Sequence, residues 1–233
     1  MPLDVNRSEL GVVVLIESFA APMFATNCWV LATGVGAECV VIDPGMPDVS
    51  HHLSAIIDEF SLKPVAVLAT HGHLDHTFSI RPIADGYGIP AYIHSQDRGS
   101  LRHPQDWVSR EFAATLQAME FIEPVDVREL RNGDVIEIVG LSIKAIHAPG
   151  HTRGSVMFVV NDEVLVSGDV LFAGSIGRTD QPTGSGKDMD ETLRNKVLPL
   201  PDHLNVLPGH GRSTTIGIER TNNPYLKSIK GRY

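Results

Sequence analysis

The chain has 233 residues, of which 42% are hydrophobic and 20% are charged, and its formal net charge is −9. This is the composition of an ordinary globular protein, so a single domain over residues 1–233 is expected. The acidic charge disfavours a nucleic-acid partner, which needs a basic surface. No apolar run approaches the ~18 residues of a membrane span, and the first ten residues lack the apolar core of a signal peptide. These absences predict a cytoplasmic protein with a small-molecule partner and no membrane partner.

The first half of the chain alternates strands with helices. Apolar runs predict strands at residues 11–17, 27–32 and 39–42, and Asp43-Pro44-Gly45 ends the last of these. Residues 50–60 have helical apolar spacing, with Ser50 available as a cap. A buried strand at 65–69 follows, then a helix after His76, a short strand at 91–93 and a helix at 110–119. Cys28 and Cys39 lie in the strand-like runs, and we expect buried free thiols.

The second half is richer in strands. Runs at 135–139, 141–147, 155–160 and 163–167 predict strands, with a hairpin turn at Asn161-Asp162. A helix at 188–197, a short strand at 205–207 and a helical tail from Thr214 complete the pattern. Two sheets packed face to face with helices outside satisfy it. A doubly wound parallel sheet is the competing fold, and the hairpins and the lack of a glycine-rich phosphate loop disfavour it.

A cluster of metal-type ligands follows the strand at 65–69. It contains His71, His73, Asp75 and His76 within six residues. Imidazole and carboxylate groups together suit zinc, iron or manganese. A strand that ends in such a cluster predicts a site, because side chains at strand ends can converge on one point.

Three more ligand-type residues also follow predicted strands, each beside a glycine: His151, Asp169 and His210. The seven residues suffice for two divalent metal ions, most simply zinc. We expect one metal to bind His71, His73 and His151, and the other to bind Asp75, His76 and His210. Asp169 has two oxygens and can bridge the two metals. A hydroxide shared by both metals is then the expected nucleophile, with Asp75 and Asp169 as the catalytic carboxylates.

Residues 70–76 resemble the His-x-His-x-Asp-His motif of the metallo-β-lactamase fold superfamily. His151, Asp169 and His210 match the later motifs of that family in order and context, and Asp43 matches its first motif, which supports the ligands. The resemblance covers about residues 12–225. It implies an α/β fold in the form of a four-layer αββα sandwich, with the metals at one edge of the two sheets.

The bridging carboxylate at Asp169 resembles the hydrolases of the glyoxalase II type. Segments 26–30, 171–180 and 219–226 are similar to those of short members of that group. The resemblance implies hydrolysis of a thioester such as S-lactoylglutathione. The chain lacks the longer C-terminal region with which the larger glyoxalase II enzymes hold glutathione, so the identity of the thiol in the substrate is left open.

One alternative is a persulfide dioxygenase with a single iron on His71, His151 and Asp169. A second alternative is a metal-bearing regulatory or binding module without turnover.

The remaining polar candidates have plainer interpretations. Arg178 can bind substrate or form a surface ion pair with Asp180. Tyr225 can face the cleft or pack the tail, and Lys227 can contact a carboxylate of the thiol or remain solvated. Trp29, Trp107 and the phenylalanines are expected in the core. The other six histidines are expected to lie outside the site: His51, His52, His94, His103, His147 and His203.

Overall fold

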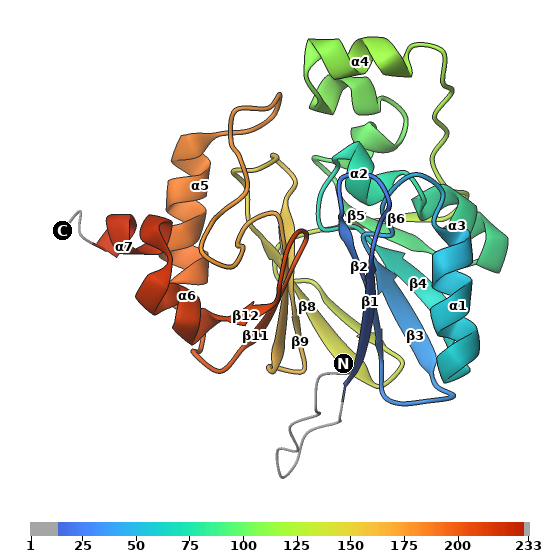
Figure 1. Cartoon of the computed structure of the whole chain (residues 1–233), viewed down its shortest axis with the longest axis horizontal. Helices are drawn as coiled ribbons and strands as arrows, with labels where there is room; N and C mark the ends of the chain where they lie inside the picture. The colour runs from blue at the N-terminus through green and yellow to red at the C-terminus, as the bar shows by residue number, and fades with distance from the viewer. Residues whose placement is uncertain (1–13, 231–233) are drawn as a thin grey trace.

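The computed structural model describes residues 14–230, in which two six-stranded sheets pack face to face (Figure 1). The first sheet has the strand order β1-β2-β3-β4-β5-β6. Strands β1 to β3 pair antiparallel, and β3 to β6 pair parallel. Its strands are β1 Leu15–Ala20, β2 Asn27–Ala32, β3 Glu38–Ile42, β4 Lys63–Leu68, β5 Ala91–His94 and β6 Val127–Leu130.

The second sheet has the order β12-β11-β10-β9-β8-β7, and only β10 and β11 of its described pairs are parallel. Its strands are β7 Val135–Ile138, β8 Leu141–His147, β9 Val156–Val160, β10 Val164–Gly168, β11 Asn205–Pro208 and β12 Thr214–Thr215.

Helices cover the outer face of each sheet (Figure 1). Helices α1 (Ser50–Phe60) and α3 (Ile80–Tyr87) lie on the first sheet. Helices α5 (Gly186–Thr192), α6 (Ile216–Asn222) and α7 (Pro224–Lys230) lie on the second, and α5 continues as a π-helical turn at Leu193–Val197. The shorter elements are α2 Leu74–Thr77, α4 Arg110–Leu116 and the 3₁₀ turns η1 Arg98–Leu101 and η2 Pro104–Trp107.

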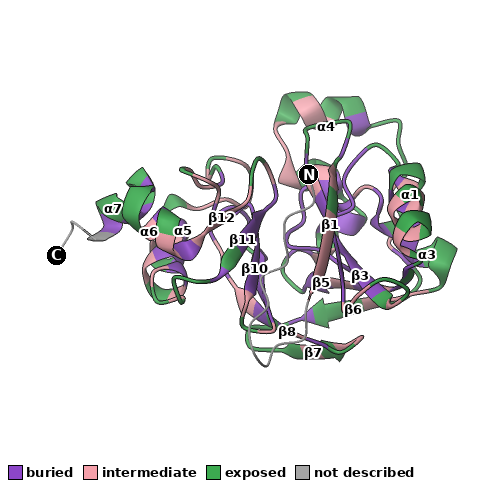
Figure 2. Ribbon diagram, turned by 60° about the horizontal axis from the view of Figure 1, so that its bottom comes forward, coloured by how far each residue is buried: buried purple, intermediate pink, exposed green. Residues whose placement is uncertain are grey.

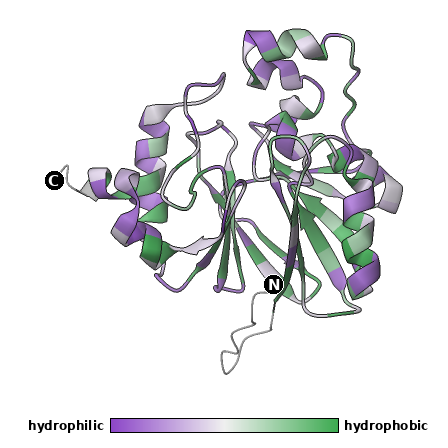
Figure 3. Cartoon of the chain, viewed as in Figure 1, coloured by the Kyte–Doolittle hydropathy of each residue, from purple (hydrophilic) through white to green (hydrophobic). Residues whose placement is uncertain are grey.

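Three hydrophobic clusters join the four layers. Along β2, Leu31 faces the other sheet while Val30 faces α1 and α3; along β9, Phe158 faces the first sheet while Met157 faces α5 and α6. Strands buried on both faces must be apolar throughout, because successive side chains point to opposite faces. Figure 2 shows these strands buried, and Figure 3 shows the hydrophobic residues concentrated along them. The predicted αββα sandwich is confirmed, and the doubly wound alternative is wrong.

Several local predictions need correction. Residues 11–13 of the first predicted strand lie outside the described residues. The metal-ligand segment contains a turn of helix, α2, which holds Asp75 and His76. Strand β6 was not predicted, because it is an edge strand whose central residues are charged and exposed. Asp48, rather than Ser50, accepts the backbone N–H at the start of α1. No described helix is long and apolar enough to cross a membrane.

Candidate metal centre

The seven predicted ligands lie at one edge of the sandwich, because each follows the carboxyl end of a strand. His71 and His73 follow β4, and α2 then presents Asp75 and His76. The other three ligands come from the second sheet: His151 follows β8, Asp169 follows β10 and His210 follows β11. The strand order therefore joins residues that are up to 139 positions apart in the sequence, from 71 to 210.

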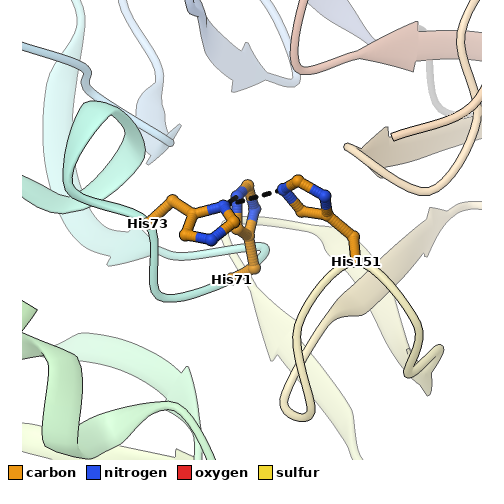
Figure 4. A group of neighbouring side chains, drawn as sticks. All are labelled: His71, His73 and His151. Atoms are coloured by element: carbon orange, nitrogen blue, oxygen red, sulfur yellow. Dashed lines mark hydrogen bonds between the residues drawn. The ribbon is translucent and has the colours of Figure 1, made fainter. Parts of the chain in front are cut away.

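The first cluster contains three buried imidazoles (Figure 4). His73 Nδ1 lies 3.1 Å from His71 Nε2 and 2.8 Å from His151 Nε2. Burial and the neighbouring imidazoles lower the pKa of His71 well below its ordinary value. Burial likewise lowers the pKa of His73 to about 4 and that of His151 to about 3. These groups are therefore neutral at pH 7, which is the form in which imidazole binds a metal.

The second cluster contains Asp75, His76 and His210. The Nε2 atoms of His76 and His210 are 3.3 Å apart, and Asp75 Oδ2 lies 3.6 Å and 3.4 Å from them. The ligand atoms of each cluster all lie within 4.8 Å of one another, which is the spacing of a metal site. Burial lowers the pKa of His76, but the carboxylates of Asp169, Asp75 and Asp43 together raise it to about 10.

Asp169 lies between the two clusters. Its Oδ2 is 3.5 Å from Nε2 of His151 and 3.5 Å from Nε2 of His210, and its Oδ1 is 3.5 Å from Nε2 of His76. Burial raises the pKa of this carboxyl to about 6. Asp169 Oδ1 is buried without a hydrogen-bond partner among the described residues. A buried acceptor without a donor is costly, and a cation bound between the clusters would satisfy it.

Each of four imidazoles makes an outer contact that orients it. His76 Nδ1 donates to Asp43 Oδ2 (2.9 Å), His151 Nδ1 to the Arg178 carbonyl (2.7 Å) and His210 Nδ1 to the Phe24 carbonyl (3.1 Å). These acceptors hold a proton on Nδ1, so that Nε2 is the nitrogen that faces the cluster. His71 Nδ1 lies 3.1 Å from the hydroxyl of Thr70.

Asp43 forms hydrogen bonds that connect the two clusters. Its Oδ1 accepts from the Thr70 backbone N–H, and its Oδ2 accepts from the Thr70 hydroxyl at 2.6 Å as well as from His76. Because Thr70 donates its hydroxyl proton to Asp43, its oxygen is free to accept from His71 Nδ1. A single buried carboxylate thus fixes an imidazole in each cluster.

A second supporting carboxylate, Asp97, was missed by the sequence analysis. It is fully buried in the turn after β5. Its Oδ2 accepts from the Gly72 N–H (2.8 Å) and the Thr152 hydroxyl (2.5 Å). Its Oδ1 accepts from the Gly154 N–H at 2.8 Å and from the Trp107 indole at 3.4 Å. Asp97 therefore joins the segment of His71 and His73 to that of His151. The available signal was its position after a strand, which it shares with the ligands.

A cavity of about 580 Å³ opens onto both clusters. Phe24, Trp107 and Phe112 line it, although the sequence analysis assigned aromatic residues to the core. Trp29 is buried as expected, but Phe24 is 54% exposed. The other lining residues are His73, Leu74, Asp75, Val108, Ser109, His151, Asp169, Phe172, Arg178, Gln181 and His210.

Of the three predicted substrate contacts, one lines the cavity and two do not. Arg178 lines the cavity and also makes the ion pair with Asp180, with N–O distances of 2.7 and 2.8 Å. Tyr225 and Lys227 do not line it, because α7 packs its apolar residues on the outer face of the second sheet. His147 lies outside both clusters, where its ring stacks on His94 at 4.1 Å. Cys28 and Cys39 are buried free thiols.

The chain has relatives among known proteins along most of its length. It is 44% identical over 223 residues to an uncharacterized protein of Mycobacterium tuberculosis, covering 93% of this chain and 99% of that one. It is 32% identical over 214 residues to hydroxyacylglutathione hydrolase GloC of Haemophilus influenzae, covering 91% and 98%.

Solved structures have the same fold. The B3 metallo-beta-lactamase BLEG-1 is 33% identical, with a TM-score of 0.79 and coverage of 91% of this chain and 99% of that one. TTHA1623 in a di-iron-bound form is 30% identical, with a TM-score of 0.73 and coverage of 91% and 100%. The family model described as metallo-beta-lactamase superfamily matches residues 21–210. The chain therefore belongs to the metallo-beta-lactamase superfamily.

Proposed function

We propose that this protein is a two-metal hydrolase that cleaves a thioester. The observation that carries the proposal is the position of Asp169, whose two carboxylate oxygens reach imidazoles of both ligand clusters. A carboxylate in this place suits a pair of metals that share one ligand. The 32% identity to hydroxyacylglutathione hydrolase GloC favours a thioester as the bond that is cleaved.

The residues present fit the metals. Five imidazole nitrogens face one another across the two clusters, and no residue within 14–230 donates a hydrogen bond to Asp169 Oδ1. The donor set of nitrogen and oxygen suits zinc, iron or manganese, and we propose zinc. When bound, the metals lower the pKa of water and polarise the carbonyl of the substrate.

The protein's own groups then orient and exchange protons. Asp43 and the carbonyls of Arg178 and Phe24 keep the imidazoles in the tautomer that binds metal. The Asp169 carboxylate lies 3.5 Å from imidazoles of both clusters, where it is placed to accept a proton from the attacking water. The aromatic side chains that line the cavity exclude water from the substrate, which strengthens the electrostatic interactions within the site.

The test is thiol release by purified, zinc-loaded protein. S-lactoylglutathione and S-butyryl-N-acetylcysteamine serve as substrates, each with and without a chelator. We expect chelator-sensitive release from at least one of them. Asp169→Ala should abolish release and lower the bound metal, because it removes a ligand from both clusters. Asp58→Ala, which alters an exposed carboxylate on α1, is the matched control and should be unaffected.

Two other outcomes of the assays would support a different function. The 33% identity to a B3 metallo-beta-lactamase favours a β-lactam amide as the second candidate substrate, so nitrocefin is included in the assay. Release of no thiol by a metal-replete sample would refute the thioester proposal. Oxygen uptake with a persulfide by an iron-loaded sample would then support the single-iron alternative.

A further inference from the structure

One wall of the cavity is apolar and largely aromatic. Its members come from four separate segments: Phe24, Leu74, Trp107, Val108, Phe112 and Phe172. The Phe24 and Phe112 rings meet edge to face, with centroids 5.8 Å apart. Phe24 is 54% exposed. A large aromatic side chain held open to solvent beside a reactive site favours a role in binding rather than in folding.

The loop that carries Phe24 is held in a strained conformation. Phe24 and Ala25 have φ angles of 62° and 54°, in the left-handed region that residues with a side chain rarely adopt. Contacts on both sides hold the loop: the Ala21 N–H donates to the Thr26 carbonyl, and Met23 pairs with Met46. The Phe24 carbonyl also accepts from His210. The ring at the mouth of the cavity is thus tied to a metal ligand.

The described lining of the cavity has few positively charged side chains that could bind an anionic thiol. Arg178 is the only lysine or arginine among the described residues that line it. Its guanidinium already makes two hydrogen bonds to Asp180. Lys227 lies outside the cavity. Glutathione carries two carboxylates, and the described wall has no unpaired lysine or arginine to receive them.

We propose that the apolar wall binds an alkyl or aromatic acyl group, so the preferred substrates are thioesters with an apolar acyl chain rather than glutathione thioesters. The kinetic test of this inference depends on the proposed thioester hydrolysis, and the binding test does not. The cavity volume of about 580 Å³ lies within the range of sites that enclose a small molecule.

The kinetic test uses acetyl, butyryl and hexanoyl thioesters of N-acetylcysteamine with the zinc-loaded protein. Each buried methylene should raise kcat/KM about threefold. Phe24→Ala and Phe112→Ala should flatten this dependence on acyl chain length, because each removes part of the apolar wall. Tyr87→Ala, an exposed aromatic residue at the end of α3, is the control and should keep the full dependence. A flat series, or S-lactoylglutathione preferred tenfold over the hexanoyl ester, would overturn the inference.

A binding measurement separates this inference from the proposed reaction. Isothermal titration calorimetry compares acetate and butyrate, the acyl products of two of these substrates, on the zinc-loaded protein. The two additional methylenes of butyrate should tighten its binding about tenfold over acetate, and Phe24→Ala should remove the gain. That gain without any thioester cleavage would refute the reaction and support the apolar site. Cleavage with equal binding of the two carboxylates would support the reaction and refute the apolar acyl site.

Discussion

Replacing Asp97 with asparagine tests whether one buried carboxylate holds the first ligand cluster together. Asp97 accepts four hydrogen bonds, from Gly72, Thr152, Gly154 and Trp107. An asparagine keeps one accepting oxygen and turns an NH₂ group toward the donors on the other side. A hydrogen bond to a charged group contributes about 1.5–3 kcal/mol, so the loss of one or two such bonds should destabilise the fold by about 2–4 kcal/mol.

The same substitution should weaken metal binding selectively. Gly72 lies between His71 and His73, and Gly154 lies three residues after His151, so Asp97→Asn loosens the first cluster. The outer contacts of the second cluster run through Asp43 and the Phe24 carbonyl and remain intact. Loss of a supporting contact costs metal affinity about 10- to 100-fold. One of two zinc equivalents should therefore weaken by that factor.

The assay is competition with a chromophoric zinc chelator, together with urea unfolding. Asp48→Asn is the control, because Asp48 also accepts a backbone N–H but lies before α1, outside both clusters. If Asp97→Asn bound two zinc equivalents with unchanged affinity, the assigned role of Asp97 would be wrong. Equal weakening of both equivalents would contradict the assignment of Asp97 to the first cluster.

Two further substitutions probe the site without removing a ligand. In Gly209→Ala the new Cβ would collide with Asp169 Oδ1 and would lie 2.7 Å from His76 Cε1. Because a displacement of about 1 Å costs about 100-fold in rate, turnover and zinc content should both fall. Gly86→Ala, whose new Cβ meets no atom within 4 Å, should change neither. In Arg178→Ala the exposed ion pair with Asp180 is lost, but the backbone carbonyl that accepts from His151 remains. A thermal melt should therefore show a nearly unchanged Tm, because exposed ion pairs contribute little to stability. Loss of zinc in this variant would show that the side chain itself holds the centre.

The sequence was sufficient to predict that the seven candidate ligands lie close together, because each of them follows a strand, and strand ends at one edge of a sheet converge. Asp97 and the aromatic wall were harder to predict, because their roles depend on contacts between distant segments. Asp97 bonds to Thr152, 55 residues away, and the Phe24 ring meets Phe112. An aromatic side chain that lines a cavity has the same local sequence pattern as one in a core. A cavity-lining aromatic residue is distinguished from a core residue only by the packing of α4 above the edge of the sandwich that carries the candidate ligands (Figure 1).

The most direct test of the account is a zinc titration of metal-free protein, with thioester hydrolysis measured at each addition. The two ligand clusters and the shared position of Asp169 predict that activity rises to its maximum as the second equivalent binds. Full activity at one equivalent, with no further rise at two, would contradict a two-metal centre.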